Sequence, residues 1–194
     1  SQSTRDSIDT YYNKFGLNFK LIDTAGIRKK SKINDNLEFY SVVRSIKAIE
    51  NCDVCLLIMD ATRSFDTQIK NIFWLAHRRN KGIVILVNKW DLVNKKEQST
   101  NKFEQKIRDE IKPFVDVHII FISCLKKQRV LKSLNYAIET YKNRSRKIKT
   151  SQLNNDLLPI IERNPPPSNK GKFVKIKYCS QIPSHSPQFV FTSS

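Results

Sequence analysis

The sequence has no long hydrophobic run, and this absence limits what the protein can be. Its longest apolar stretches, such as CLLIM at residues 55–59, are far shorter than the ~18 residues that a membrane-spanning helix requires. The first residues also lack the basic and apolar pattern of a signal sequence. We therefore expect a cytoplasmic protein without a membrane span.

Cysteine and histidine are too few and too scattered to predict a metal centre. The 4 cysteines include one C-x-x-C pair, Cys52 and Cys55, but no second pair completes a zinc site. Because the pair enters an apolar strand, where residues three apart point to opposite faces, reduced core cysteines are the favoured interpretation. The 3 histidines stand singly, which favours structural roles for them.

Acidic residues are also in short supply, with 18 Asp and Glu against 35 Lys and Arg, and the net charge is +17. The electric field of so large a positive charge attracts polyanions, and ribosomal or other structured RNA is the obvious candidate partner. The chain is also rich in Lys, Asn and Ile and holds only 4 Gly, a bias that AT-rich coding would produce without any RNA binding. Charge alone leaves both interpretations open.

Apolar runs alternate with helical patterns along the first three quarters of the chain. The predicted strands cover residues 9–15, 17–23, 54–61, 82–89 and 117–123, and the predicted helices cover 37–49, 67–79, 100–112 and 127–142. Strands this apolar, alternating with helices, predict an α/β fold with a doubly wound, mostly parallel sheet that is covered on both faces.

Polar residues follow three of these strands where the strands end. LID runs into Thr24 to Gly26, ILV runs into Asn88 to Asp91, and IIFI runs into Ser123 and Cys124. Ligands of open α/β sheets bind at the carboxyl ends of the strands, because the loops there present polar groups on a rigid frame. The three clusters therefore predict one site.

The motifs D-T-A-G at 23–26, N-K-W-D at 88–91 and S-C-L at 123–125 together resemble those of translation-factor-related GTPases. The stretches STRDSIDTYY, DTAGIRKKSKI, NKWDLV, KTSQLN and NPPPSNKGKFVKIKYCSQ extend the resemblance to the Der (EngA) GTPase family over essentially the whole chain. The likeness is to the second GTPase domain and the KH-like domain after it. It implies a P-loop GTPase-type domain over 1–146 and a partial α+β KH-like domain over 147–194.

The resemblance implies guanine-binding roles that chemistry supports. Asp91 would accept hydrogen bonds from the N1 and exocyclic amino groups of guanine, a pairing that adenine cannot offer. Asn88 would bond the base and neighbouring loops, and the stem of Lys89 would lie along the ring. Beside Ser123, Cys124 stands where the family usually has Ala, and its backbone N–H would meet the guanine oxygen. A helix cap after a strand is the alternative for Asn88 and Asp91.

The resemblance also implies GTP or GDP with Mg²⁺ as ligands. Asp23 would hold the magnesium through water, Thr4 would complete its shell in the triphosphate state, and the N–H of Gly26 would reach the terminal phosphate. Ile27 stands where Ras-like enzymes have a water-orienting Gln, so hydrolysis would be slow alone and helped by K⁺ or a partner. No residue is assigned as a general base.

The phosphate loop G-x-x-x-x-G-K-[ST] is absent from the sequence, and so is the strand that leads into it. That strand lies mid-sheet in this fold, between residues 17–23 and 54–61, and the gap would leave two unpaired edges. We therefore expect a fragment of a longer protein, whose own GTPase activity is doubtful even if that of the parent is not.

The organisation changes after residue 146. A helix over 149–164, capped by Thr150 or Ser151, precedes a Pro-rich loop and two strands at 173–179 and 188–193. The basic run at 142–149 fits an RNA contact or an exposed helix end equally well. We expect these lysines either to lie on a solvated strand face or to contact RNA: Lys170, Lys172, Lys175 and Lys177.

Two functions follow from the resemblance. The first is a GTP-hydrolysing switch that acts in large ribosomal subunit biogenesis, with rRNA and an upstream GTPase domain of the same parent protein as partners. The second is a non-catalytic rRNA- or ribosome-binding module that keeps the scaffold without GTP turnover. The run KKQR at 126–129, in place of the expected glycines, favours the second. A tRNA-modifying GTPase is a weaker third candidate, because it would lack the Pro-rich tail.

Overall fold

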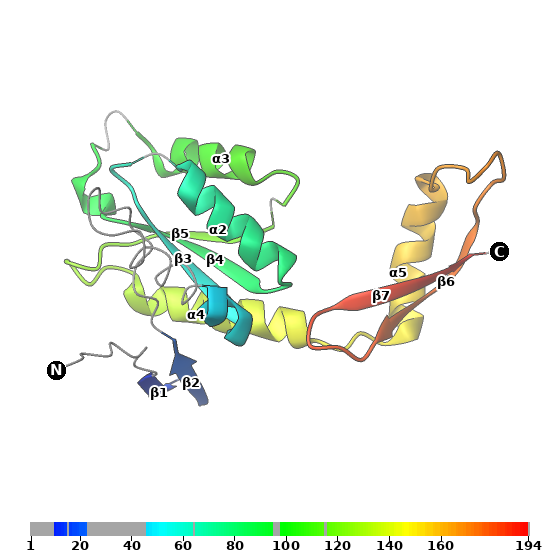
Figure 1. Ribbon diagram of the computed structural model, residues 1–194, viewed down its shortest axis with the longest axis horizontal. Coiled ribbons are helices and arrows are strands. Elements are labelled where there is room, and N and C mark those ends of the chain that lie inside the picture. The colour runs from blue at the N-terminus through cyan, green and yellow to red at the C-terminus, as the bar shows by residue number, and fades with distance from the viewer. Residues whose placement is uncertain are drawn as a thin grey trace. The chain divides into compact units, whose positions relative to one another are not determined.

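The computed structural model describes residues 10–14, 16–22, 46–63, 65–94, 98–114 and 116–193 (Figure 1). The chain divides into two compact units, Ser1–Ala137 and Ile138–Ser194. Of the predicted helix 37–49, only residues 46–49 are described; they are helical, and the helix continues to residue 51. The predicted ligands Thr4, Asp23 and Gly26 lie outside the described residues, as does Ile27.

The first two predicted strands are confirmed as a hairpin. Strand β1 (Thr10–Lys14) pairs antiparallel with β2 (Leu17–Leu21), and Lys14 lies opposite Leu17 next to the turn. Gly16 has a φ of +71°, a left-handed conformation that tight hairpin turns require and that glycine adopts at no steric cost.

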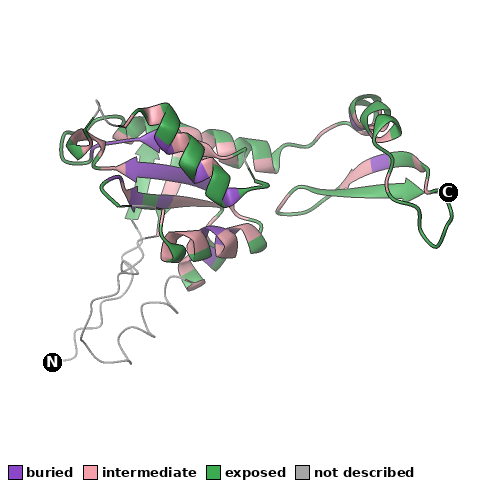
Figure 2. Cartoon of the chain, turned by 90° about the horizontal axis from the view of Figure 1, so that it is seen from above, coloured by how far each residue is buried: buried purple, intermediate pink, exposed green. Residues whose placement is uncertain are grey.

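The centre of the first unit is a parallel sheet in which β4 (Gly82–Asn88) lies between β3 (Val54–Asp60) and β5 (His118–Phe121). The interior residues of β4 are all buried, as its unbroken apolar sequence predicts (Figure 2). No described strand pairs with the other edge of β3, and β2 is not part of this sheet. The sequence predicted a gap at this edge.

Helices cover both faces of the sheet, which confirms the predicted α/β fold (Figure 1). Helices α2 (Thr67–Arg78) and α3 (Thr100–Ile111) lie on one face, where Phe73 and Ile107 belong to the same buried cluster as Ile85. On the other face, α4 (Val130–Ser145) places Tyr136 against Val84 and other buried residues. The central strand is thus shielded from water on both sides.

Two helices begin with the side-chain caps that fix their register beside the sheet. The Asp66 carboxylate accepts the N–H of Ile69 at 2.9 Å at the start of α2, and the Ser99 hydroxyl accepts the N–H of Lys102 at 3.3 Å at the start of α3. Helix α4 begins three residues later than the sequence predicted, because Arg129 has a φ of 58° and cannot be helical. None of the described helices combines the length and the apolar character that crossing a membrane requires.

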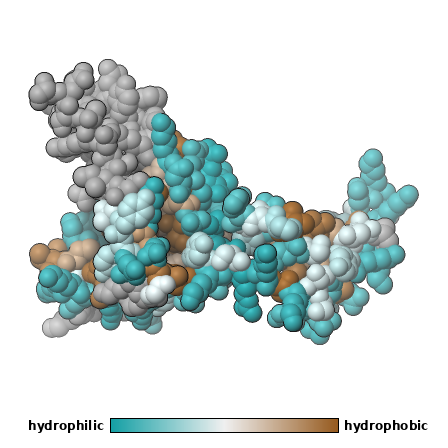
Figure 3. Space-filling view, turned by 90° about the horizontal axis from the view of Figure 1, so that it is seen from below, coloured by the Kyte–Doolittle hydropathy of each residue, from teal (hydrophilic) through white to brown (hydrophobic). Residues whose placement is uncertain are grey.

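The second unit contains α5 (Thr150–Arg163) and a hairpin of β6 (Ile176–Ile182) and β7 (Gln188–Ser193). Asn154 joins the helix to the hairpin: its side chain accepts the N–H of Cys179 at 2.8 Å and donates to the Cys179 carbonyl at 2.9 Å. Every residue of β7 is exposed. Figure 3 shows hydrophobic side chains at the surface of this unit among hydrophilic ones.

Two details of the second unit differ from the sequence prediction. The predicted cap of α5 at Thr150 or Ser151 is wrong: Lys149 is the capping residue, with extended backbone and no side-chain bond, and Thr150 is already helical. The strand predicted at 173–179 runs from Ile176 to Ile182 instead, so the apolar pattern located the element but placed its start three residues early.

Candidate functional site

The carboxyl ends of β3, β4 and β5 meet at one edge of the sheet, because the three strands are parallel and in register. After β5 the pairing continues, with the N–H of Ile122 donating to the Val87 carbonyl at 2.8 Å and the N–H of Trp90 donating to the Ile122 carbonyl at 3.2 Å. These bonds bring the N-K-W-D turn and the S-C-L segment together.

The Trp90 side chain anchors this turn to the core. Its ring centroid lies 4.5 Å from that of Phe121 and 5.5 Å from that of Phe103. The short 3₁₀ helix η1 (Trp90–Leu92) begins at this anchored residue and contains Asp91. The aromatic residue inside N-K-W-D thus fixes the direction in which the neighbouring carboxylate leaves the sheet.

Asn88 ties two of the strand ends together. Its side-chain oxygen accepts the backbone N–H of Cys124 at 3.0 Å. The amide therefore bridges β4 and the segment after β5, as the sequence predicted for a residue that joins loops. The same N–H of Cys124 was predicted to meet a guanine oxygen, and in this structure Asn88 engages it.

The Asp91 carboxylate lies beside Ser123. A hydrogen bond from the Ser123 side chain is the main cause that lowers the pKa of Asp91, and the Lys126 charge adds to it. Lys126 Nζ lies 3.8 Å from Asp91 Oδ2, and 7% of the Asp91 side chain is exposed. The carboxylate is thus held ionised next to a buried serine, with oxygen lone pairs that these contacts do not use.

The Lys89 head group pairs with a carboxylate, and its predicted contact with a base stays a prediction. Its Nζ donates to Asp60 Oδ2 at 2.6 Å, and its backbone is left-handed, with φ 64° and ψ 27°. The Lys89 and Thr62 hydrogen bonds hold the pKa of the Asp60 carboxyl well below its usual range. The ammonium therefore pairs with a carboxylate that stays ionised near neutral pH.

The loop after Ser123 is closed by its own hydrogen bonds. Ser123 and Gln128 exchange backbone bonds of 3.2 and 2.9 Å, and the Ser123 hydroxyl accepts the N–H of Lys126 at 3.2 Å. Lys127 and Arg129 have positive φ values of 53° and 58°. These two residues adopt the left-handed backbone conformation that glycine adopts most readily. The KKQR run therefore still closes the loop, although it stands in place of the expected glycines.

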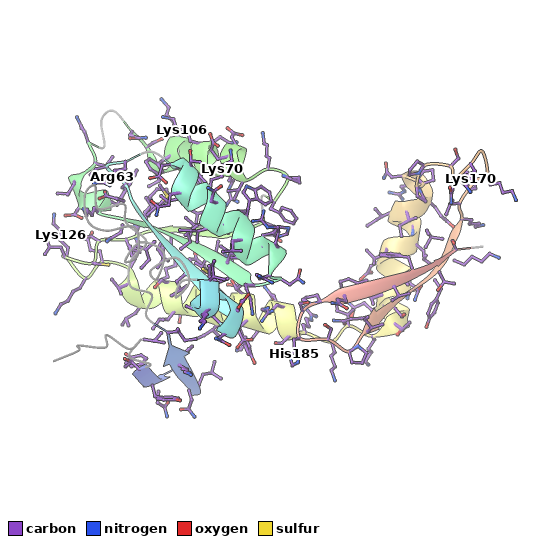
Figure 4. The ribbon with its side chains drawn as sticks, viewed as in Figure 1. Arg63, Lys70, Lys106, Lys126, Lys170 and His185 are labelled. Atoms are coloured by element: carbon purple, nitrogen blue, oxygen red, sulfur yellow. The ribbon has the colours of Figure 1, made fainter. Side chains whose placement is uncertain are left out.

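The structure brings five of the predicted site residues together: Asn88, Lys89, Asp91, Ser123 and Cys124. Figure 4 shows Lys126 and Arg63 on the side of the first unit where the strands end. Among the described residues no group of three or more His, Cys, Asp or Glu side chains could hold a metal ion. Cys55 packs against the core, and burial raises the pKa of its thiol to about 12.

Residues 2–143 match the sequence model of the elongation factor Tu GTP binding domain family. The chain belongs to this family. Residues 147–194 match a second family, the C-terminal KH-domain-like region of EngA bacterial GTPase enzymes. The two matches follow one another along the chain.

Curated relatives are similar to this chain over nearly its whole length. GTPase Der of Christiangramia forsetii is 64% identical over 189 residues, which are 97% of this chain and 44% of that protein. GTPase Der of Bacteroides thetaiotaomicron is 56% identical over 191 residues, with the same shares of 97% and 44%. The chain thus spans less than half the length of the curated relatives that it matches.

Solved structures of GTP-binding proteins share the fold. Era in complex with MgGDPNP and nucleotides 1506–1542 of 16S ribosomal RNA has a TM-score of 0.60 at 23% identity, over 71% of this chain and 45% of that one. Elongation factor SelB from Methanococcus maripaludis with the GTP analogue GppNHp has a TM-score of 0.59 at 19% identity, over 72% and 29%. At these identities the likeness shows the fold alone.

Sequence reasoning missed two residues of the site in this GTP binding domain. Asp60 is the last residue of β3 and pairs with Lys89, and Lys126 lies next to Asp91. The rule that located the other residues, polar side chains at the carboxyl ends of parallel strands, would also have found Asp60. No comparable signal existed for Lys126, because its position depends on how the loop after Ser123 closes.

Proposed function

We propose that the chain is the guanine-nucleotide-binding part of a GTP-hydrolysing switch protein. The observation that carries the proposal is the ionised carboxylate of Asp91 beside Ser123, at the edge where β4 and β5 end. Membership in the elongation factor Tu GTP binding domain family supports it independently.

The residues present fit the edge of a guanine ring. Guanine offers two adjacent donors, N1–H and the exocyclic amine, and an ionised carboxylate at Asp91 accepts both, whereas adenine presents an unprotonated nitrogen at N1. The backbone N–H of Cys124 donates to the Asn88 side chain at 3.0 Å, which joins the two neighbouring loops beside Asp91. In the proposal, Asp91 selects the base and Asn88 holds the two loops at the spacing that the base requires.

We also propose Thr4 and Asp23 as ligands of Mg²⁺, which would neutralise phosphate charge, and Gly26 as a backbone donor to the terminal phosphate. Hydroxyl and carboxylate oxygens are the ligands that Mg²⁺ prefers. Ile27 occupies the position of a water-orienting glutamine, so GTP hydrolysis by the parent protein is proposed to depend on K⁺ or on a partner.

The proposed partners are the large ribosomal subunit and its rRNA, in ribosome biogenesis in the cytoplasm, together with an upstream GTPase domain of the same parent protein. The net charge of +17 supports an RNA partner, because each phosphate contact by Lys or Arg releases counterions. The basic residues at the end of α4 and after it are the proposed contact: Lys142, Arg144, Arg146, Lys147 and Lys149.

A second candidate is an rRNA- or ribosome-binding module that keeps this scaffold without GTP turnover. The sequence contains no G-x-x-x-x-G-K-[ST] motif, which normally supplies backbone amides and a lysine for the phosphates. The two candidates differ in one property that can be measured directly, the preference of the chain for guanine nucleotide.

Titration of the chain with fluorescent GDP and fluorescent ADP tests the proposal. Two hydrogen bonds to a charged acceptor predict a preference for GDP of roughly a hundredfold. The matched control is Asp116→Asn, which removes an exposed carboxylate before β5 and should leave the preference unchanged. Equal binding of the two nucleotides would contradict the switch and favour the module.

A salt series with ribosomal RNA tests the partner. Contacts to several phosphates predict that the logarithm of the binding constant falls steeply and linearly with the logarithm of salt concentration. A flat dependence would show that the charge has another origin, such as coding bias.

A further inference from the structure

Asp60 ends β3 directly beside the candidate site, and both oxygens of its carboxylate are engaged. Oδ2 accepts from Lys89 Nζ at 2.6 Å. Oδ1 accepts the Thr62 backbone N–H at 3.0 Å and the Thr62 hydroxyl at 2.7 Å. Only 11% of the Asp60 side chain is exposed. A carboxylate committed in this way has little capacity left for a ligand of its own.

We propose that Asp60 is a positioning residue that holds Lys89 in place for the nucleotide base. The proposal rests on the guanine-nucleotide function proposed above and deepens it. Asp60 acts through Lys89 and does not touch the base, and Thr62 fixes the carboxylate that holds the lysine.

The backbone places the two residues for this contact. Asp60 lies opposite Asn88 in the parallel pairing of β3 and β4, and the N–H of Ala61 donates to the Asn88 carbonyl at 2.8 Å. Lys89 follows immediately in a left-handed conformation, which costs a non-glycine residue energy because its Cβ approaches the following carbonyl. This turn directs the lysine side chain back to the neighbouring strand, where Asp60 meets it.

The contact prepares the lysine before a ligand arrives. A free lysine side chain has many rotamers, and ordering them opposes binding. The ion pair with Asp60 restricts these rotamers in the unliganded chain, so less entropy is lost when a base settles against the stem. Because the pKa of Asp60 is well below its usual range, the contact persists throughout the neutral pH range.

A double-mutant cycle measures whether Asp60 acts through Lys89. The dissociation constant for fluorescent GDP is measured for the 194-residue chain, for Asp60→Asn, for Lys89→Met and for the double variant. We expect Asp60→Asn to weaken binding by about five- to tenfold, the cost of ordering one long side chain. In the Lys89→Met background the same substitution should have no further effect. Asp116→Asn, an exposed carboxylate, serves as the charge-matched control.

Each outcome of the cycle is decisive. An equal loss in both backgrounds, or no loss in either, would overturn the positioning role while leaving the proposed function intact. Failure of the unaltered chain to prefer GDP over ADP would overturn the proposed function and the positioning role together.

A second measurement covers the case in which Asp60→Asn fails to fold. The ¹⁵N resonance of the Lys89 ammonium, recorded on the nucleotide-free chain, reports the contact directly. Slow hydrogen exchange and restricted motion of this group support the proposal, and they should diminish in Thr62→Val, which removes one of the bonds that hold Asp60. An ammonium as mobile as those of exposed lysines would overturn the proposal.

Discussion

The polar side chains at the end of the central sheet and those of the second unit are used in opposite ways. In the second unit, Asn154 and Gln181 spend their amides on the backbone: Asn154 bonds both polar groups of Cys179, and Gln181 bonds Ile148 and Arg146. At the end of the sheet, side chains bond one another as well as the backbone, and Asp91 keeps acceptor capacity after its contacts with Ser123 and Lys126.

This difference distinguishes side chains that stabilise the fold from side chains that can bind a ligand. A side chain whose hydrogen bonds are consumed by the main chain holds elements together, whereas one that is ionised, fixed in place and only partly satisfied can recognise a ligand. By this criterion Asp91 is the candidate for ligand recognition and Asn154 is part of the scaffold. Asp60 lies between the two, because its proposed role is to hold Lys89.

The largest effect is expected in the core beneath the site. Ile85 is fully buried in β4, so Ile85→Ala should lower the free energy of unfolding by about 2–5 kcal/mol through lost burial and a residual cavity. Hydrogen exchange should show reduced protection in β3, β4 and β5. Ile58→Ala is the matched control, since Ile58 in β3 is 58% exposed, and a comparable loss there would contradict this account of the core.

A smaller but substantial effect is expected for the scaffold amide of the second unit. Asn154→Ala leaves the N–H and carbonyl of Cys179 without their partner and should cost about 1–3 kcal/mol. Amide exchange of α5 and β6 measures the change, with the exposed Asn155→Ala as control. If the two variants behave alike, the amide does not hold the helix to the hairpin.

Lowering the pH should lower the free energy of unfolding of the first unit. The pKa values of Asp60 and Asp91 are lowered in the folded chain, so the unfolded chain binds more protons. The stabilisation is therefore complete above the ordinary Asp pKa of about 4 and is lost as pH falls through the lowered values. Urea midpoints from pH 6 to pH 2.5 should fall less steeply for Asp60→Asn than for the unaltered chain. Parallel curves would contradict the role of the Asp60 contacts.

The smallest effect is expected for an ion pair away from the site. Lys70 and Glu110 join α2 to α3 at 2.8 Å, but their side chains are 42% and 48% exposed. Lys70→Gln should therefore change the free energy of unfolding by less than about 0.5 kcal/mol. Chemical denaturation at low and high salt checks this. A loss above about 1 kcal/mol would mean that exposed charges carry more of the stability than the buried strands suggest.

Much of the fold could be predicted because its signals are local. The apolar run of β4 predicts a strand shielded on both faces, and the polar residues after it predict the position of Asn88 and Asp91. Element boundaries were less predictable. The start of α4 depends on the left-handed backbone of Arg129, and the cap of α5 depends on where Lys149 leaves the extended conformation.

The contacts within the site were less predictable than its members. That Lys89 binds Asp60 follows from the register of β3 against β4, which no local pattern specifies. The position of Lys126 follows from the closure of the Ser123–Gln128 loop, which replaces expected glycines with residues of positive φ. Long-range register and backbone conformation, rather than residue type, decide these details.

Base recognition by Asp91 is tested most directly by a change of nucleotide. Xanthine carries an oxygen where guanine carries its exocyclic amine, so an asparagine amide at position 91 can donate to xanthine and can no longer accept both guanine donors. Asp91→Asn should therefore lose affinity for fluorescent GDP by roughly a hundredfold and gain affinity for fluorescent XDP, whereas Asp116→Asn should change neither. Unchanged GDP affinity in Asp91→Asn would contradict the assignment of this carboxylate to the base.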